Sequence, residues 1–299
     1  MNEFDELLKM KKENKSIIFA ILAAALYAIS TPVSKLLLQN VPPTMVTAFL
    51  YLGAGIGMGL MMLIRYRFKK GVKEERLTRA DIPYAAAMVA LDIVAPILMM
   101  YGLRINSAAN TALLNNFEIV ATALIALLFF REKVGKRLWI AIALVTVASI
   151  LLSLDGSSAA DALRFSKGSL LVLGATVCWG LENNCTRRIA DKDPMEIETV
   201  KGFGSGLGAL SIALSLGEAF PMWRHLVILL MLGFVAYGLS IFFYTLAQRG
   251  IGAAKTSTYY ALAPFIGAFL SVVILGEPIG WIFILATIVM AAGCWLAGK

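Results

Sequence analysis

The stretch TMVTAFLYLGAGIGMGLMMLI occupies residues 44–64 and contains no charged side chain. A transmembrane helix needs about 20 consecutive, mostly apolar residues to cross the hydrocarbon core of a bilayer. This stretch is long enough to do so, and it is followed by the basic residues Arg65 and Arg67. We therefore predict a membrane-spanning helix over residues 44–64.

The rest of the chain has a similar composition. The 299 residues are 59% apolar and 15% charged, with a mean hydropathy of +0.79, whereas soluble globular proteins average about 25% charged residues. This composition excludes a soluble enzyme, a nucleic-acid binder and a disordered chain. At about 20 residues a span, the length allows roughly ten to twelve spans.

Ten apolar segments alternate with polar or Gly- and Pro-containing connections. The sequence therefore predicts an all-α membrane protein with ten transmembrane helices. The residues before the first segment, 1–15, form a predicted cytoplasmic N-terminal tail, and they lack the apolar core of a cleaved signal peptide. The segments cover residues 16–38, 44–64, 82–103, 108–130, 138–154, 169–186, 197–216, 226–246, 253–275 and 279–297.

The basic residues predict the orientation, because Lys and Arg concentrate in the cytoplasmic segments of membrane proteins. With the N-terminus inside, only four basic residues fall in the outer loops, namely Arg104, Arg164, Lys167 and Arg224. We expect a multi-pass protein of the inner (cytoplasmic) membrane with both termini in the cytoplasm. The net charge of +8 then reflects membrane topology.

The two halves of the chain resemble each other. A shift of 145 residues superposes Glu132 on Glu277, and a shift of 152 superposes Tyr27 on Trp179. Because five spans is an odd number, two copies enter the membrane in opposite directions, as in secondary transporters whose substrate site lies near the midplane. We predict two inverted five-helix repeats over 16–154 and 168–299, with a linker over 155–167.

Two short motifs mark corresponding turns in the halves. Gly276-Glu-Pro-Ile-Gly280 lies between the last two spans, and its counterpart is Arg131-Glu-Lys-Val-Gly135, with Arg131 for Gly and Lys133 for Pro. With the ten-span repeat, this arrangement resembles the drug/metabolite transporter superfamily, EamA type, over residues 16–297. The resemblance implies a transporter fold in which spans 1, 3, 4, 6, 8 and 9 surround a central cavity and spans 5 and 10 lie at the periphery.

Acidic residues inside the predicted spans are candidate functional groups, because a charge in the bilayer is costly. Asp92 and Glu118 lie near mid-depth of the third and fourth spans, and Glu182 lies in the sixth, nearer the cytoplasm. Asn115 belongs to a polar stripe with Glu118 at helical spacing, and Asn183 is adjacent to Glu182. Such polar side chains should face away from lipid.

We interpret Glu118 as the residue that binds a cationic group or a proton. Burial favours the neutral carboxyl group and a bound cation favours the carboxylate, so the two ligands compete for one side chain, as antiport requires. Two structural alternatives stay open: Glu118 only ties helices together, or Asp92 satisfies backbone groups near Pro96.

Aromatic side chains supply the other part of a site for a small organic substrate, because they stack on planar groups and attract cations. Tyr27 and Trp179 are preferred because the repeat relates them, whereas Tyr259 and Tyr260 lie either in the cavity or at the membrane interface. Packing is the alternative for each aromatic residue. The predicted substrate site comprises Glu118, Asn115, Trp179, Glu182, Asn183, Tyr27, Asp92 and Tyr259, with Glu118 as the proton-coupling residue.

Several other residues have structural explanations. Lys201 lies one turn from Glu198, so the two charges either neutralise each other or reach the membrane interface. Lys35 acts as a gate or only marks topology. Pro32, Pro96 and Pro264 are candidate hinges. Glycines 53, 55, 57 and 59 and glycines 202, 204, 206 and 208 have the spacing of closely packed helices.

The predicted function is secondary active transport, by alternating access and proton antiport, of small cationic or zwitterionic metabolites such as amino acids, amines or guanidinium-like compounds. Export follows from the resemblance alone. The expected partners are the substrate, protons and the lipid bilayer, without nucleic acid, cofactor or metal ion. A passive facilitator or channel for small organic solutes is the alternative. An intramembrane enzyme is disfavoured because the single histidine, His225, lies at a span edge and no HExxH motif is present.

Overall fold

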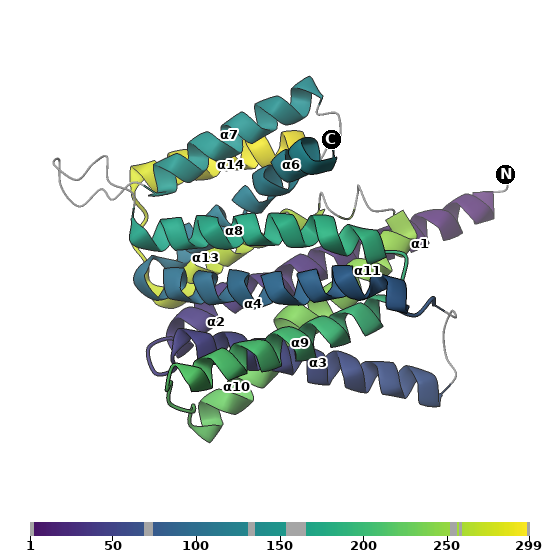
Figure 1. Ribbon diagram of the computed structural model, residues 1–299. Helices are drawn as coiled ribbons and strands as arrows, with labels where there is room; N and C mark the ends of the chain where they lie inside the picture. The colour runs from purple at the N-terminus through teal and green to yellow at the C-terminus, as the bar shows by residue number, and fades with distance from the viewer. Residues whose placement is uncertain are drawn as a thin grey trace.

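A computed structural model describes residues 3–68, 74–130, 135–153, 166–251, 256 and 259–297. The described residues form helices joined by short connections, with no strand among them (Figure 1). Most of the predicted linker 155–167 and residues 131–134 of the first turn motif lie outside these ranges.

The predicted first half contributes seven α-helices and a 3-10 turn within the described ranges. They are α1 (Glu3–Ala28), α2 (Ser30–Leu37), α3 (Pro43–Arg67), η1 (Arg79–Asp81), α4 (Ile82–Ile105), α5 (Ala108–Leu114), α6 (Phe117–Phe130) and α7 (Lys136–Ser153). The described part of the second half contributes α8 (Lys167–Thr186), η2 (Arg187–Ile189), α9 (Pro194–Ser215), α10 (Trp223–Gly233), η3 (Phe234–Leu239), α11 (Ser240–Ile251), α13 (Ala263–Leu275) and α14 (Trp281–Ala297).

Several helices have the length and composition of membrane spans. Among the described residues, five segments qualify by length and hydropathy: Glu13–Leu37, Pro43–Arg67, Arg79–Ile105, Lys136–Ser153 and Trp223–Ile251. The shorter helices α13 and α14 are also apolar. Large apolar side chains are exposed on the helices, among them Leu128 at 71%, Phe269 at 66% and Trp281 at 73%. Such a surface suits contact with lipid. The count of ten spans stays a prediction.

Two predicted spans of the first half are interrupted. The first divides at Ile29 into α1 and α2, where Pro32 has no N–H to donate to the carbonyl one turn earlier. The fourth divides into α5 and α6 at Asn115 and Asn116. There the Asn116 side-chain amide donates to the Leu113 carbonyl at 3.2 Å, and such a local bond competes with regular helix geometry. The polar stripe predicted on one helix therefore runs across this break.

The other two candidate hinges lie within helices. α4 continues through Pro96, and Pro264 lies in the first turn of α13, where a missing N–H has little cost. A different irregularity occurs in the eighth predicted span, where the π-helical turn η3 joins α10 to α11. A π turn holds more residues than an α turn and is frequent at functional sites.

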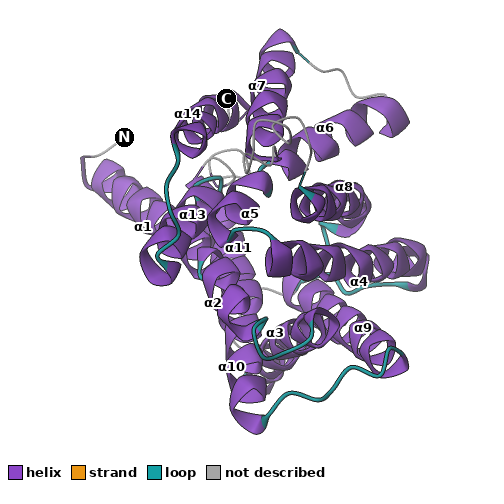
Figure 2. Ribbon diagram, turned by 90° about the vertical axis from the view of Figure 1, so that its left-hand side faces the viewer, coloured by secondary structure: helices purple, strands orange, loops and turns teal. Residues whose placement is uncertain are grey.

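The helices pack in pairs that join the two predicted halves. α3 packs along α9, α4 along α8, α7 along α14 and α1 along α11 (Figures 1 and 2). In each pair one helix comes from each half. Two halves related by a two-fold axis produce this kind of pairing, although the inverted repeat itself stays a prediction.

The pairing of α3 with α9 depends on glycine. A Cβ atom on Gly202 would lie 2.4 Å from the backbone nitrogen of Gly55, and one on Gly55 would lie 2.8 Å from the Phe203 nitrogen. At Gly206 a Cβ would meet Leu52 at 2.8 Å. The close helix approach predicted from the glycine spacing is thus confirmed for these positions, because a larger side chain would separate the backbones.

Candidate substrate-binding site

A cavity of about 540 Å³ lies between the helices of the two halves. This volume is in the range of small-molecule sites, about 300–1,000 Å³. Seven of the eight residues predicted for the substrate site line it: Tyr27, Asp92, Asn115, Glu118, Trp179, Glu182 and Asn183. Other lining residues are Tyr51, Asn116, Thr186, Glu198, Lys201, Tyr237, Tyr244 and Tyr260.

The cavity extends toward one end of the bundle. We call this the termini end, because α1 begins there and α14 ends there (Figure 1). Its lining includes Thr186, the last residue of α8, Glu198 in the first turns of α9, and Ala297 at the end of α14. In the other direction it reaches Asp92 and Asn115, which lie deeper in the bundle. The lining therefore runs from the middle of the bundle to the termini end.

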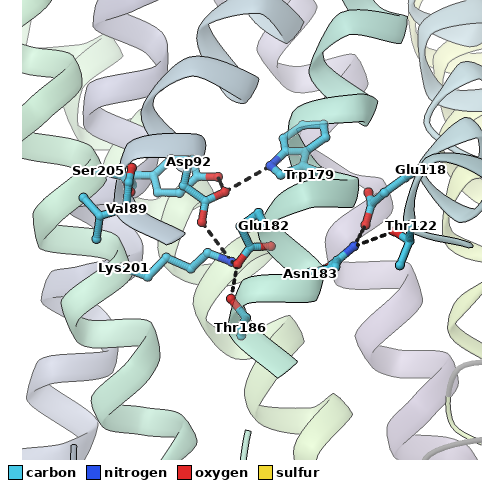
Figure 3. A network of polar contacts seen from close by, with 11 residues as sticks. Val89, Asp92, Glu118, Thr122, Trp179, Glu182, Asn183, Thr186, Lys201 and Ser205 are labelled. Carbon is cyan, nitrogen blue, oxygen red and sulfur yellow. Dashed lines mark hydrogen bonds and ion pairs between the residues drawn. The ribbon is translucent and has the colours of Figure 1, made fainter. Parts of the chain in front are cut away.

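A lysine and two carboxylates form the most charged part of the cavity. The Nζ atom of Lys201 lies 3.0 Å from Oδ2 of Asp92 and 3.1 Å from Oε1 of Glu182. The three side chains come from α9, α4 and α8 and point toward one another (Figure 3). We call Asp92, Glu182 and Lys201 the ion triad. With all three groups charged, the ion triad carries one net negative charge.

Neutral donors support the two carboxylates of the triad. The Tyr51 hydroxyl donates to Oδ1 of Asp92 at 3.2 Å, and the Trp179 indole N–H donates to the same oxygen at 3.1 Å. The Thr186 hydroxyl donates to Glu182. The partners of Asp92 are therefore side chains from other helices, and not the backbone groups near Pro96 that were the alternative. Such donors stabilise and orient a buried carboxylate.

Glu118 occupies a separate position on the other side of α8 (Figure 3). The Asn183 side-chain amide donates to its Oε1 at 2.6 Å and also lies 3.3 Å from the Thr122 hydroxyl. Among the described residues no basic side chain lies within ion-pair distance of Glu118. Glu118 is thus held by a neutral donor, in contrast to the carboxylates of the ion triad.

Glu198 is the fourth carboxylate of the cavity. It is 9% exposed and lies one turn before Lys201 on α9. The spacing suggested an ion pair between these two residues, but the ammonium of Lys201 contacts Asp92 and Glu182 instead. The local spacing was misleading because the long lysine side chain reaches across to α4 and α8.

Tyrosine rings form a continuous row along the cavity, which we call the tyrosine wall. Ring centroids are separated by 5.5 Å between Tyr51 and Tyr237, 5.8 Å between Tyr237 and Tyr27, 5.9 Å between Tyr27 and Tyr260, and 5.0 Å between Tyr260 and Tyr244. These distances lie in the range of favourable aromatic pairs. Tyr237 enters the row from the π turn η3, so the irregular turn has a direct effect on the shape of the cavity.

Some residues lie elsewhere than predicted, and others were missed. Tyr259 does not line the cavity, whereas its neighbour Tyr260 does. Tyr51 and Tyr237 were missed although each has a polar residue one helical turn away, Thr47 before Tyr51 and Ser240 after Tyr237. Lys201 carried a usable signal, since a lysine within a predicted span needs a buried partner.

Polar contacts join the helices at the end opposite the termini, which we call the Glu277 end. The Lys35 ammonium donates to the carbonyls of Leu103 at 2.6 Å, Arg104 at 3.1 Å and Asn106 at 2.6 Å, at the end of α4. The Glu277 carboxylate accepts from the first N–H groups of α5. These contacts hold together segments from α2, α4, α5 and the turn after α13. Lys35 is therefore more than a marker of topology.

A further carboxylate, that of Glu218, also joins separate segments at the Glu277 end. Glu218 accepts hydrogen bonds from the Met45 backbone N–H at 3.0 Å and the Tyr101 hydroxyl at 3.2 Å. It thereby links the loop after α9 to the start of α3 and to α4. Tyr101, an aromatic residue of the third span, is thus engaged away from the cavity.

Ion pairs at the termini end connect the last turn of α3 and the loop before η1 with the second half. Lys192 lies 2.8 Å from Glu75, and the hydrogen bond from Lys192 to the Glu75 carboxylate raises the pKa of Lys192. Arg65 pairs with Asp193, and Arg249 pairs with Glu74.

Among the described residues, no three His, Cys, Asp or Glu side chains form a group that could hold a metal ion.

Comparison with known proteins agrees with this architecture. A family model described as the EamA-like transporter family matches residues 14–154 and 166–298. The two matched ranges fall close to the predicted halves, whose boundaries stay a prediction. A protein of known crystal structure superposes on this chain with a TM-score of 0.67 and 16% sequence identity. The superposition covers 95% of this chain and 97% of the other one, so the two share a fold.

Two relatives are described as uncharacterized transporters. One, from Methanothermobacter thermautotrophicus, is 27% identical over 288 residues, which cover 92% of this chain and 84% of that protein. The other, YyaM of Bacillus subtilis, is 26% identical over 242 residues, or 78% of each chain. The helical bundle, its apolar surface and the match over both halves identify a multi-pass membrane transporter, and the chain belongs to the EamA-like transporter family.

Proposed function

We propose that this protein is a secondary active transporter that exports small organic cations or zwitterions from the cytoplasm in exchange for protons. Amines, amino acids and guanidinium-like compounds have the required charge. The cationic group of the substrate binds at Glu118, and a proton replaces it there in the other half of the cycle.

The observation that carries this proposal is the difference between Glu118 and the ion triad. Asp92 and Glu182 already have Lys201 as a partner at 3.0 and 3.1 Å. Glu118 lines the same cavity, but the group that donates to its carboxylate is the neutral amide of Asn183. A carboxylate in such a place is stabilised by an incoming cation or by protonation. The two ligands exclude each other, which is the requirement for exchange.

The tyrosine wall supports an organic rather than an inorganic cargo. Aromatic faces attract ammonium and guanidinium groups and also contact apolar carbon. The cavity volume of about 540 Å³ leaves room for a metabolite with several carbon atoms. The wall and Glu118 together provide one surface for the body of the substrate and one carboxylate for its charge.

The distribution of polar contacts supports an inward-open state of an alternating-access cycle. The cavity lining reaches the termini end, whereas Lys35, Glu218 and Glu277 join the helices at the opposite end. With the basic segments of the chain in the cytoplasm, the termini end faces the cytoplasm of an inner membrane. Export then requires the contacts at the Glu277 end to open while the termini end closes.

Purified protein in liposomes provides the test. A pH-sensitive dye inside the vesicles reports proton flux when pools of amines, amino acids or guanidinium compounds are added. We expect substrate-dependent proton movement in the wild type and none with Glu118→Gln. Asp191→Asn is a matched control, because Asp191 has a side chain that is 66% exposed outside the cavity.

The outcomes separate the proposal from passive transport. Full proton-coupled exchange by Glu118→Gln would remove Glu118 from the mechanism. Uptake of labelled substrate without proton movement would overturn the proposed antiport; counterflow against unlabelled substrate would then establish a facilitator, and its absence a channel.

A further inference from the structure

The ammonium group of Lys201 lies in surroundings that would also suit the ammonium group of a bound organic amine. Its Nζ atom lies between Asp92 on α4 and Glu182 on α8, at 3.0 and 3.1 Å. The Asp92 side chain is 0% exposed and that of Glu182 is 4% exposed, while Lys201 is 16% exposed. All three residues line the cavity. The position between the two carboxylates is therefore a cation site within reach of the substrate cavity.

This site is held in place independently of Lys201. Tyr51 and Trp179 donate to Oδ1 of Asp92, which leaves Oδ2 directed at the ammonium. Thr186 donates to Glu182 from one turn further along α8. These contacts come from side chains on α3 and α8 and do not involve α9. Two oriented carboxylates would thus persist if the ammonium were removed.

We propose that Lys201 is a specificity-determining residue: its ammonium fills the cation site formed by Asp92 and Glu182 and denies that site to a second cationic group of a substrate bound at Glu118. This inference rests on the proposed function for the role of Glu118. The site itself is defined by the ion triad alone. Removal of the lysine side chain empties this cation site. An external alkylammonium ion, or the second ammonium group of a diamine, can then bind there.

The first test replaces the missing group with a free amine. Lys201→Ala is purified in detergent, and its thermal unfolding is followed with and without 1-aminopropane. We expect the amine to raise the midpoint of Lys201→Ala more than it raises that of the wild type, in which only Glu118 is open to it. The triple variant Lys201→Ala, Asp92→Asn, Glu182→Gln is the matched control, and the amine should raise its midpoint no more than that of the wild type. A rise in Lys201→Ala no larger than that in the wild type would overturn the proposal.

The second test measures specificity directly. Binding of 1,5-diaminopentane is compared with that of 1-aminopentane in the wild type and in Lys201→Ala. We expect the ratio of the two affinities to shift toward the diamine by about tenfold or more in the variant, since one added ion pair in a partly buried site has an effect of this order. An unchanged ratio would show that Lys201 does not exclude the second charge.

Loss of the lysine leaves two carboxylates close together, and their repulsion could prevent Lys201→Ala from folding. A second variant avoids this repulsion. Lys201→Ala with Glu182→Gln keeps Asp92, with its Tyr51 and Trp179 donors, and removes one positive and one negative charge together. It should still be stabilised by 1-aminopropane relative to the wild type, and a lack of stabilisation would count against the site.

These binding measurements do not depend on transport. If the wild type moved no organic cation in liposomes, the proposed function would fail while amine binding to Lys201→Ala would still be measured. If Lys201→Ala gained no amine binding, this inference would fail whatever the wild type transports.

Discussion

The carboxylate of Glu277 accepts a hydrogen bond at 2.7 Å from the backbone N–H of Ala108, a residue 169 positions earlier in the chain. Its second oxygen accepts from the next N–H, that of Ala109, at 2.8 Å. The turn between α13 and α14 is thus fastened to the start of α5, in the other predicted half. A carboxylate in this position complements the partial positive charge of a helix N-terminus.

Glu277→Gln should weaken the contact at the Glu277 end. An amide offers one acceptor oxygen instead of two and lacks the charge, and loss of a helix N-terminal partner typically costs about 0.5–2 kcal/mol. We expect the variant to populate the state open at this end more often. A cysteine placed at Ile119 in the cavity, in a background without Cys178, Cys185 and Cys294, would then react faster with a membrane-impermeant maleimide added outside oriented vesicles.

The matched control for this experiment is Glu196→Gln. Glu196 also accepts from a backbone N–H, that of Leu77 at 3.1 Å, but it lies at the termini end. Outside labelling that rises equally in both variants would indicate general loosening of the bundle rather than opening at Glu277.

Substrate binding should depend on pH through Glu118. Protons and the cationic group compete for this carboxylate, so the apparent affinity for an organic cation should fall as the pH falls. Isothermal titration over a pH series is the measurement. In Glu118→Gln the affinity should be low throughout and the slope with pH should disappear, whereas a slope that survives would assign the competing proton to another group, with Glu198 the first to examine.

Trp179 should contribute through both its ring and its N–H group. It is 8% exposed, lines the cavity and donates to Asp92 at 3.1 Å. Trp179→Phe keeps an aromatic ring but removes the donor, and hydrogen bonds to charged groups contribute about 1.5–3 kcal/mol. We expect Trp179→Phe to weaken substrate binding by roughly tenfold, and Trp179→Ala to weaken it further, with a smaller loss of purified yield. Parallel losses of binding and yield would indicate that Trp179 acts only in packing.

Gly202→Val should separate α3 from α9. The Cβ atom alone would come within 2.4 Å of the Gly55 nitrogen, and a branched side chain cannot avoid that backbone. Overpacking of this kind costs about 1–3 kcal/mol or more, so the thermal midpoint in detergent should fall. Gly59→Ala is a suitable control, since the nearest neighbouring atom to its Cβ is 3.5 Å away, and its midpoint should stay close to that of the wild type.

The membrane character and the acidic residues were predictable because they depend on local chemistry. A run of apolar residues long enough to cross a bilayer indicates a span wherever it occurs, and a carboxylate inside one needs a partner or a function. This reasoning identified Asp92, Glu118 and Glu182, which all line the cavity.

The partners of those residues were not predictable from spacing. Spacing relates residues within one helix, so it joined Lys201 to Glu198, whereas the contacts of Lys201 cross to α4 and α8. The prediction that Tyr259, and not Tyr260, belongs to the substrate site was wrong for a related reason. Adjacent residues point in different directions, and the turn at Ala261 and Leu262 before α13 removes the helical phase that would select one of them.

The tyrosine wall has a consequence for how the transport cycle can be observed. Tyr27 and Tyr51 belong to the first predicted half, and the other three rings belong to the second, with Tyr27 5.8 Å from Tyr237. Any rotation of one half against the other changes this ring contact and the distances from the tyrosines to Trp179. Because tyrosine excitation passes to tryptophan with a steep dependence on distance, the intrinsic fluorescence of the unlabelled protein should report its own conformational state.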